Sequence, residues 1–292
     1  MNIAIFGKSF EESSSKYIQQ LICFLEENKF GISVYDVFFD FLKKKIKFAN
    51  DPKLFNKSAD IAHTIDFLIS IGGDGTILGT LPLVHDSKIP ILGINTGRLG
   101  FLSSVSAENA VEAIQLLIKK EYDIDQRTVL KVEAGDNNLI EYNFGLNELS
   151  VHKKAIQAMI TVHTFLNNDF LNSYWADGLI ISTTTGSTAY SLSCGGPILL
   201  PESKNFVITP IAPHTLTVRP IVVPDNVKIK LKIESRSKKF MLNIDSRTYL
   251  IDSSNEITIQ KANFNINLII LKNQKFLVTL RNKLMWGIDK RN

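Results

Sequence analysis

Short, continuous apolar runs separated by polar or glycine-rich segments fill the first part of the chain. Runs of this kind are typical of strands that are buried on both faces of a parallel sheet. The predicted strands are residues 2–6, 32–37, 67–71 and 89–94, and the polar segment 43–57 is predicted to be a loop or an irregular helix. Between the strands, apolar residues recur at helical spacing in 14–28 and in 106–118, where Ser106 is the expected N-cap. A further helix is predicted over 76–84, with Pro82 tolerated near its end.

The pattern changes near residues 122–127, where the helical spacing ends. From residue 128 onward, short runs rich in β-branched residues predict a series of strands. These strands are residues 129–134, 140–146, 156–166, 169–175, 178–182, 218–223, 227–233, 239–244 and 256–259. A last strand, 266–272, and a helix, 276–285, are expected to pack back on the first part of the chain.

The chain has 292 residues, of which 45% are hydrophobic and 21% charged, so it has enough apolar material for two folded domains. The element pattern divides it into an α/β N-terminal domain, residues 1–126 with 266–292, and a β-rich C-terminal domain, residues 127–265. The net charge of +4 would help to attract an anionic ligand. The basic residues lie in short scattered runs without interleaved aromatics, which does not indicate nucleic-acid binding.

Other features of the sequence predict the compartment. The two cysteines, Cys23 and Cys194, lie far apart without metal-ligand spacing, and we interpret them as free thiols in a reducing environment. Residues 1–7 have the pattern of a first strand rather than of a signal peptide. No apolar run approaches the ~18 residues that a membrane span needs. We therefore expect a cytoplasmic protein with no membrane partner.

A glycine-rich turn, Gly72-Gly73-Asp74-Gly75-Thr76, follows the predicted strand 67–71. Glycines allow positive-φ turns and let a ligand approach the backbone without a Cβ in the way. A carboxylate at the carboxyl end of a strand lies where open α/β sheets bind their ligands. The turn therefore predicts a phosphate or nucleotide site with Asp74 as a chemical group. The alternative, in which Asp74 only caps a helix, is left open by these residues alone.

Three further polar clusters interrupt the β-rich half. Asn147 and Glu148 follow an apolar run, and an amide beside a carboxylate can bind ribose hydroxyls or base edges, although a turn is the commoner role. Residues 177–197 contain a strand, then a dense run of hydroxyls and glycine and the start of a short helix near Ser187, which suits a phosphate or an adenosine. Asn243 to Ser246 is interpreted as a turn.

In combination, these motifs resemble the bacterial NAD kinase family. The resemblance is carried by Gly72–Thr76, Asn95–Phe101, Asn147-Glu148, Asp177–Pro197, and Pro213–Leu216 with Arg219-Pro220, and it extends from about Ile3 to Thr279. The Gly-Gly-Asp-Gly motif is shared with diacylglycerol and sphingosine kinases and with phosphofructokinases. The Asn-Glu pair and the block after Asp177 are far more specific.

The resemblance implies a two-domain fold with the active site in the cleft between the domains. It implies transfer of the ATP γ-phosphoryl group to the 2′-hydroxyl of the adenosine ribose of NAD, with a divalent cation such as Mg²⁺, and a homodimer or homotetramer. Asp74 would be the general base. The residues implied to bind NAD are Asp74, Gly75, Phe101, Asn147, Glu148, Asp177, Thr188, Ala189, Tyr190, Ser191, Leu192, Ser193 and Ala212. Those implied to bind the ATP phosphates are Gly72, Gly73, Gly75 and Thr76, and no side chain is assigned as a metal ligand.

The sequence departs from the family pattern at a few positions. Gly79 stands where many relatives have arginine, Trp175 where a basic residue is frequent, Thr184 where proline is usual, and Ser246-Arg247 where Gly-Gln is commoner. These departures concern phosphate contacts and the preference between NAD and NADH. Two other functions are weighed: a lipid kinase, which shares Gly-Gly-Asp-Gly but does not predict the Asn-Glu pair, and a dinucleotide-binding regulator without turnover.

Overall fold

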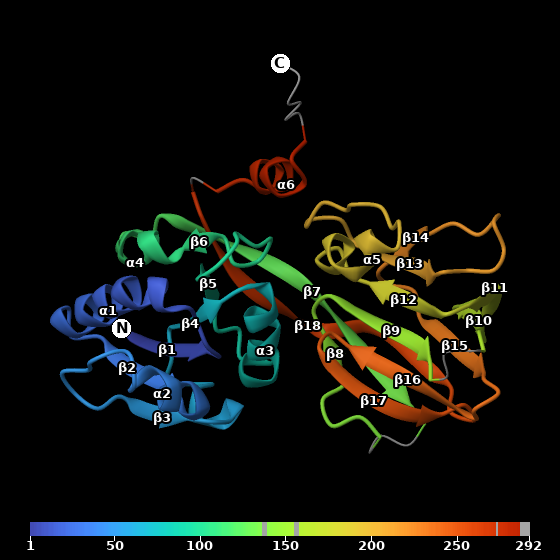
Figure 1. Ribbon diagram of the computed structural model, residues 1–292, viewed down its shortest axis with the longest axis horizontal. Helices are drawn as coiled ribbons and strands as arrows, with labels where there is room; N and C mark the ends of the chain where they lie inside the picture. The colour runs from blue at the N-terminus through green and yellow to red at the C-terminus, as the bar shows by residue number, and fades with distance from the viewer. Residues whose placement is uncertain (136–138, 155–157, 273, 287–292) are drawn as a thin grey trace. The chain divides into compact units, whose positions relative to one another are not determined.

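The computed structural model describes residues 1–135, 139–154, 158–272 and 274–286. The chain forms two compact units, Met1–Gln126 with Ile266–Asn292, and Arg127–Asn265. Two long strands, β7 (Tyr122–Ala134) and β18 (Ile257–Leu271), contain the points at which the chain leaves one unit and enters the other (Figure 1). No helix of the described residues is both long and apolar enough to cross a bilayer.

The first unit is an α/β layer. Its strands are β1 (Asn2–Gly7), β2 (Gly31–Tyr35), β3 (Lys53–Phe55), β4 (Phe67–Gly72), β5 (Ile91–Asn95) and β6 (Val105–Ser106). Its helices are α1 (Glu12–Glu27), α2 (Asp36–Leu42), α3 (Asp74–Val84), α4 (Ala110–Ile118) and α6 (Phe276–Leu284). The strands pair in parallel in the order β18-β5-β4-β1-β2-β3. Parallel strands need crossover connections, and α1 and α3 supply two of them.

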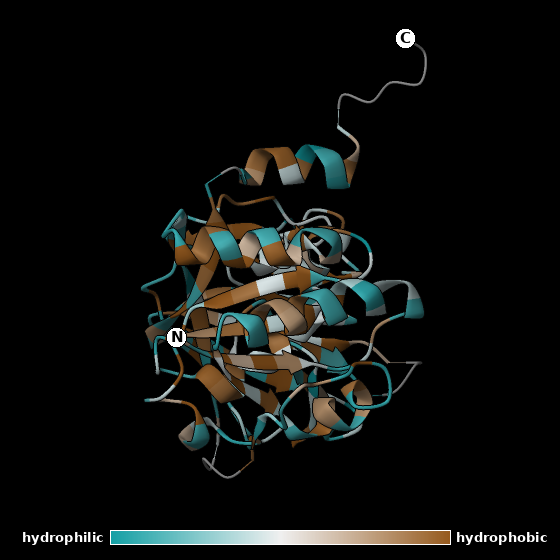
Figure 2. Ribbon diagram, turned by 90° about the vertical axis from the view of Figure 1, so that its left-hand side faces the viewer, coloured by the Kyte–Doolittle hydropathy of each residue, from teal (hydrophilic) through white to brown (hydrophobic). Residues whose placement is uncertain are grey.

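Burial explains why these apolar runs become strands. All residues of β5 are buried, as are five of the six in β1. Figure 2 shows the strands as mainly hydrophobic and the helices as a mixture of hydrophobic and hydrophilic residues. Helix α1 buries Ile18, Leu21, Ile22 and Leu25 against the sheet. Strands β4 and β5 end side by side, because Gly72 pairs with Asn95. The two loops that follow these strands therefore start at the same edge of the sheet.

The second unit is built from antiparallel strands. They are β8 (Phe144–Gly145), β9 (Glu148–Lys153), β10 (Ile160–Leu166), β11 (Asp169–Ala176), β12 (Gly178–Ser182), β13 (Asn205–Ile211), β14 (Ile221–Pro224), β15 (Ile229–Glu234), β16 (Lys239–Ile244) and β17 (Arg247–Asp252). A short α-helix, α5 (Tyr190–Ser193), follows a 3₁₀ turn in the same unit. One sheet has the order β14-β13-β12-β9-β16-β17, and β11-β10-β15-β18 form a second group. Buried residues of both, among them Val162, Ile181 and Phe240, form one core.

Several sequence predictions were wrong in detail. Helix α2 and strands β9, β13 and β17 were not predicted, and β3 lies in the segment expected to be a loop or an irregular helix. Residues 140–146 were predicted as a strand, but only Phe144–Gly145 pairs. The last two predicted strands, 256–259 and 266–272, are one continuous strand. Ser106 makes no side-chain cap bond, since a 3₁₀ turn, Ala107–Asn109, precedes α4. Part of the strand predicted over 156–166 lies outside the described residues.

Candidate active site

The glycine turn holds the Asp74 carboxylate against the loop that follows β5. Helix α3 begins at Asp74, one residue beyond Gly73, its N-cap. The backbone N–H of Phe101 donates to Oδ2 at 2.8 Å, and those of Leu102 and Ser103 donate to Oδ1 at 3.0 and 2.9 Å. A carboxylate offers about four lone-pair positions. Three are used here, and Oδ2 retains an acceptor position.

Asn95 shapes the loop so that these N–H groups converge. Its side-chain oxygen accepts from the Gly97 N–H at 2.7 Å, and its amide nitrogen donates to the Arg98 carbonyl at 2.7 Å. Gly100 closes the turn through an N–H bond to the Ser103 carbonyl at 3.1 Å. A Cβ on Gly100 would lie 1.8 Å from Asp74 Oδ1. The close approach of loop and carboxylate therefore requires glycine at this position.

The other glycines of the turn have two different roles. Gly72 has a φ of +149°, and a Cβ there would lie 2.2 Å from Thr76 Oγ1. Gly73 and Gly75 are exposed, and a Cβ at either would meet nothing within 4 Å. Thr76 is buried beneath the turn. The turn thus leaves open space over two glycines beside the Asp74 carboxylate, where a large anion can approach the backbone.

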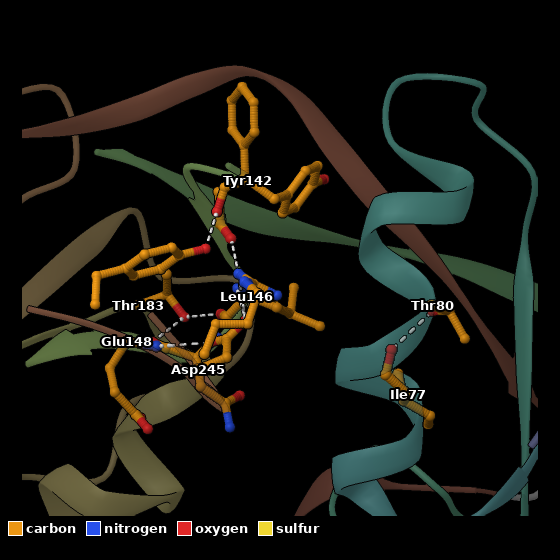
Figure 3. Close-up of polar contacts among 11 residues, drawn as sticks. Ile77, Thr80, Tyr142, Leu146, Glu148, Thr183 and Asp245 are labelled. Atoms are coloured by element: carbon orange, nitrogen blue, oxygen red, sulfur yellow. Dashed lines mark hydrogen bonds and ion pairs between the residues drawn. The ribbon is translucent and has the colours of Figure 1, made fainter. Parts of the chain in front are cut away.

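In the second unit, the buried carboxylate of Asp245 binds the backbone of Asn147 and Glu148. Asp245 accepts the backbone N–H groups of Leu146, Asn147 and Glu148 at 2.9, 2.8 and 3.2 Å (Figure 3). In return, the Asp245 N–H donates to the Glu148 carbonyl at 2.9 Å. The sequence interpretation of Asp245 as only a turn residue missed this contact, since no local pattern links positions so far apart in the chain.

The Asn147 and Glu148 side chains present buried polar atoms. Asn147 Oδ1 and Glu148 Oε2 have no hydrogen-bond partner among the described residues. Burial, and to a lesser degree the charge of Asp245, raises the pKa of Glu148 to about 8. At neutral pH the Glu148 side chain is therefore protonated, so it can donate as well as accept a hydrogen bond. Unpaired buried polar atoms are costly, and a polar ligand would satisfy them.

Most hydroxyl groups in the Ser/Thr-rich run after β12 make hydrogen bonds within the protein, which stabilise the loop. Thr183 Oγ1 donates to the Leu146 carbonyl at 2.6 Å, and Ser187 Oγ donates to the Thr184 carbonyl at 2.7 Å. Ser191 Oγ is buried against Thr209 Oγ1 at 2.8 Å. The Ser191 side chain is therefore part of the packing of this unit, and its role in binding NAD stays a prediction. Thr188, Ala189, Leu192 and Ser193 are at least partly accessible.

Two more predicted residues lie beside this loop. The Tyr190 ring stacks on His152 at 5.9 Å between centroids. Burial first, with smaller effects that include the charges of Asp177 and Glu148, raises the pKa of Tyr190. Asp177 itself pairs with Lys153 Nζ at 2.5 Å. These contacts bring Glu148, Asp177 and Tyr190 together in one unit.

Ala212 and Phe101 are the remaining predicted residues, and Ala212 follows Ile211, whose carbonyl accepts from the Asp177 N–H at 3.0 Å. Ala212 is exposed with a φ of +43°. In the first unit, the Phe101 ring packs against Phe276 at 6.2 Å, and Lys283 Nζ lies 5.6 Å from its centroid. No cluster of three or more His, Cys, Asp or Glu side chains suited to a metal occurs among the described residues.

The fold and these polar groups define a two-domain nucleotide-dependent kinase. The profile of the ATP-NAD kinase N-terminal domain matches residues 3–122, and that of the C-terminal domain matches residues 146–271. NAD kinases of Flavobacterium psychrophilum and Bacteroides fragilis are 47% and 43% identical to the chain over the full length of both proteins. The chain belongs to the ATP-NAD kinase family.

Solved structures agree with this assignment. An NAD kinase from Archaeoglobus fulgidus in complex with ATP is 27% identical, with a TM-score of 0.73 over 98% of this chain and 99% of that one. Yeast NADH kinase complexed with NADH, 24% identical, shares the fold with a TM-score of 0.85 over 99% of this chain and 88% of that one. Together these likenesses place the whole chain in one two-domain fold.

We predict that Gly100→Ala will displace the Asp74 carboxylate and lower NAD kinase activity by ~10²-fold or more, the scale of a lost general base. The reason is the 1.8 Å approach between a Cβ at this position and Asp74 Oδ1. Gly97→Ala is the matched control in the same loop, because its Cβ would meet only Asn95 Oδ1, at 3.9 Å. Full activity in Gly100→Ala would show that the contact is not needed.

The buried Glu148 predicts a pH-dependent stability. Because its folded-state pKa is raised to about 8, the folded protein keeps a proton that the unfolded chain releases near its ordinary pKa. The free energy of unfolding should therefore fall as the pH rises from about 5 to about 8. Glu148→Gln should remove this pH dependence. As the pH rises, the free energy of unfolding of Glu148→Gln should therefore increase relative to that of the wild type by more than about 1.4 kcal/mol, the equivalent of one pKa unit.

Urea unfolding of both proteins at pH 5.5 and 8.5 measures this difference. Glu133→Gln is the control, since Glu133 is partly exposed in the same unit and pairs with Lys131. Parallel curves for Glu148→Gln and the wild type would show that Glu148 is ionised in the folded protein.

Proposed function

We propose that this protein transfers the γ-phosphoryl group of ATP to the 2′-hydroxyl of the adenosine ribose of NAD, giving NADP and ADP. One observation supports this most directly: the Asp74 carboxylate, held by three backbone N–H groups, keeps an acceptor position on Oδ2 beside two glycines with open space. Membership of the ATP-NAD kinase family supports the choice of substrates.

Asp74 is proposed as the general base. A sugar hydroxyl is a poor nucleophile until a positioned carboxylate accepts its proton. Oδ2 takes the proton of the 2′-hydroxyl, the ribose oxygen forms a bond to the γ-phosphorus, and the bond from that phosphorus to the β,γ-bridging oxygen breaks, with ADP as the leaving group. The three N–H donors fix the carboxylate during this transfer, so that no reorganisation is needed.

The glycine turn is proposed to bind the ATP phosphates. The N-terminus of α3 carries the unpaired N–H groups and partial positive charge that favour an anion. Lys8, exposed at the end of β1, adds a cation: its Cε lies 4.0 Å from the position of a Cβ on Gly79. Many relatives have an arginine where this chain has Gly79, and Lys8 is proposed to supply the positive charge of that arginine. A divalent cation, carried chiefly by the phosphates, would neutralise the charge that develops on transfer.

Asn147 and Glu148 are proposed to hold the adenosine of NAD. Their unpaired atoms, Asn147 Oδ1 and Glu148 Oε2, offer an acceptor and a protonated carboxyl to the ribose hydroxyls or the adenine edge. The chemistry requires that this ribose reach Oδ2 of Asp74. The other predicted contacts, including Phe101, Asp177, Tyr190 and Ala212, remain predictions, as do a cleft between the domains and a cytoplasmic location.

One assay separates the competing functions. The protein is incubated with ATP, Mg²⁺ and NAD, and NADP is followed with a dehydrogenase specific for it. The proposal expects NADP; phosphorylation of a diacylglycerol or sphingosine without NADP would favour a lipid kinase, and NAD binding without any turnover would favour a regulator. We predict that Asp74→Asn folds and binds NAD but loses ~10²–10⁴-fold in kcat. Turnover within a few-fold of the wild type would exclude Asp74 as the base.

We also propose that the protein is a homo-oligomer that uses an apolar face of the second unit. Among the described strands β11 is at an edge of its sheet, and it exposes Phe170 and Trp175. The Trp175 ring lies 4.2 Å from His214, two residues before Leu216, which is 87% exposed. An edge strand with exposed aromatic residues is a ready pairing surface, and a second copy of the chain is the occupant that the family resemblance implies.

We expect a dimer or tetramer by size-exclusion chromatography with light scattering, and we expect Leu216→Asp to shift it toward the monomer because a charge would be buried in the interface. Leu250→Asp, at a 51% exposed leucine on β17, is the matched control and should keep the wild-type mass. A monomeric wild type, or an unchanged mass for Leu216→Asp, would contradict this surface.

A further inference from the structure

Asp245 is a buried acidic residue that the proposed reaction does not use. Its side chain is fully buried, and its nearest cation, Arg247, places Nη2 4.0 Å from Oδ2. We propose that Asp245 is a positioning residue for the dinucleotide site: by binding three consecutive N–H groups it fixes the backbone from which Asn147 and Glu148 reach the ligand. The inference rests on the proposed function, since it assigns a role within the NAD site.

The hairpin that carries Asp245 does not by itself need an acid there. Ile244 pairs with Arg247, so Asp245 and Ser246 form a two-residue turn between β16 and β17. Asp245 has a φ of +49°, which glycine or asparagine adopts at least as readily. What distinguishes aspartate is a carboxylate able to accept from all of the N–H groups of residues 146–148 at 2.8 to 3.2 Å.

The burial of this carboxylate is unfavourable for stability alone. Desolvation raises the pKa of Asp245 although the three N–H bonds and Arg247 lower it. A buried charge that its partners do not fully compensate is weak evidence for a stabilising role. Two of the three residues that it holds, however, are among those with unpaired buried side-chain atoms, Asn147 Oδ1 and Glu148 Oε2.

The hydroxyl-rich loop after β12 also binds the segment of residues 146–148, through a carbonyl group. The Asn147 carbonyl accepts from the Thr183 N–H at 2.9 Å, and a Cβ on Gly186 would lie 2.1 Å from that carbonyl oxygen. Asp245 holds the N–H of Asn147 and the loop holds its C=O. Both ends of the residue are therefore fixed, which sets the direction of its side chain before a ligand binds.

The test is the substrate dependence of Asp245→Asn. Asparagine keeps the size and the φ preference, but its NH₂ group replaces one acceptor oxygen and faces a backbone N–H. We expect the KM for NAD to rise at least about tenfold, equivalent to about 1.4 kcal/mol. The KM for ATP should stay within about threefold, because the segment that Asp245 binds, Leu146–Glu148, is not among the residues proposed to bind the ATP phosphates.

Asp225→Asn is the matched control for burial. Its carboxylate is 7% exposed in the same unit and pairs with Lys261 Nζ at 2.6 Å. It should lower thermal stability without changing the KM for NAD. If Asp245→Asn fails to fold, Asp245→Gly serves instead, because glycine suits the φ of +49° and removes the carboxylate without adding a donor.

Calorimetric titration with NAD is run in parallel, since it does not depend on turnover. Weaker NAD binding by the same factor supports the inference. An unchanged KM and affinity for NAD in a folded variant, or an equal rise in the KM for ATP, would overturn it. A wild type that binds NAD but makes no NADP would instead contradict the proposed function, while the affinity comparison would still decide the role of Asp245.

Discussion

Two carboxylates, each holding three consecutive backbone N–H groups, are the interactions on which the candidate site residues of each unit depend. Asp74 holds Phe101 to Ser103, and Asp245 holds Leu146 to Glu148. A charge-assisted bond from a backbone N–H is short and directional, so three of them fix both the acid and the loop. Asp74 is partly exposed, as its proposed role as a base requires, whereas the Asp245 side chain is fully buried and is proposed to act through the segment it holds.

These contacts require a close approach of backbone to side chain, which explains the glycines around them. Gly100 leaves room for the Asp74 carboxylate, and Gly186 leaves room for the Asn147 carbonyl. At both positions the backbone itself does not demand glycine through a positive φ. The constraint comes instead from a neighbouring polar group, which would be displaced by a single methyl group. Small residues near a site can therefore be as informative as the polar ones.

Much of the fold followed from apolar patterning. The runs that became β1, β4 and β5 are continuous and buried on both faces, and helix α1 shows clear helical spacing. Where the pattern was weak, prediction was wrong. Helix α2 is dominated by phenylalanines, which do not distinguish helix from strand, and β17 has one buried residue in six. Strand β9 was not predicted, and its first residue, Glu148, was interpreted with Asn147 as a polar pair that follows an apolar run.

By itself, the sequence determined the glycine turn, the Asn-Glu pair and the family that carries them, because these are short contiguous motifs with specific chemistry. Only the tertiary structure decided how the motifs are held. Asp245 lies 97 to 99 residues from the N–H groups it accepts, and Ser191 turns its hydroxyl toward Thr209, 18 residues away. Hydrogen bonds between such distant residues leave no periodic trace in a single sequence, since they are set by strand pairing rather than by local backbone preference.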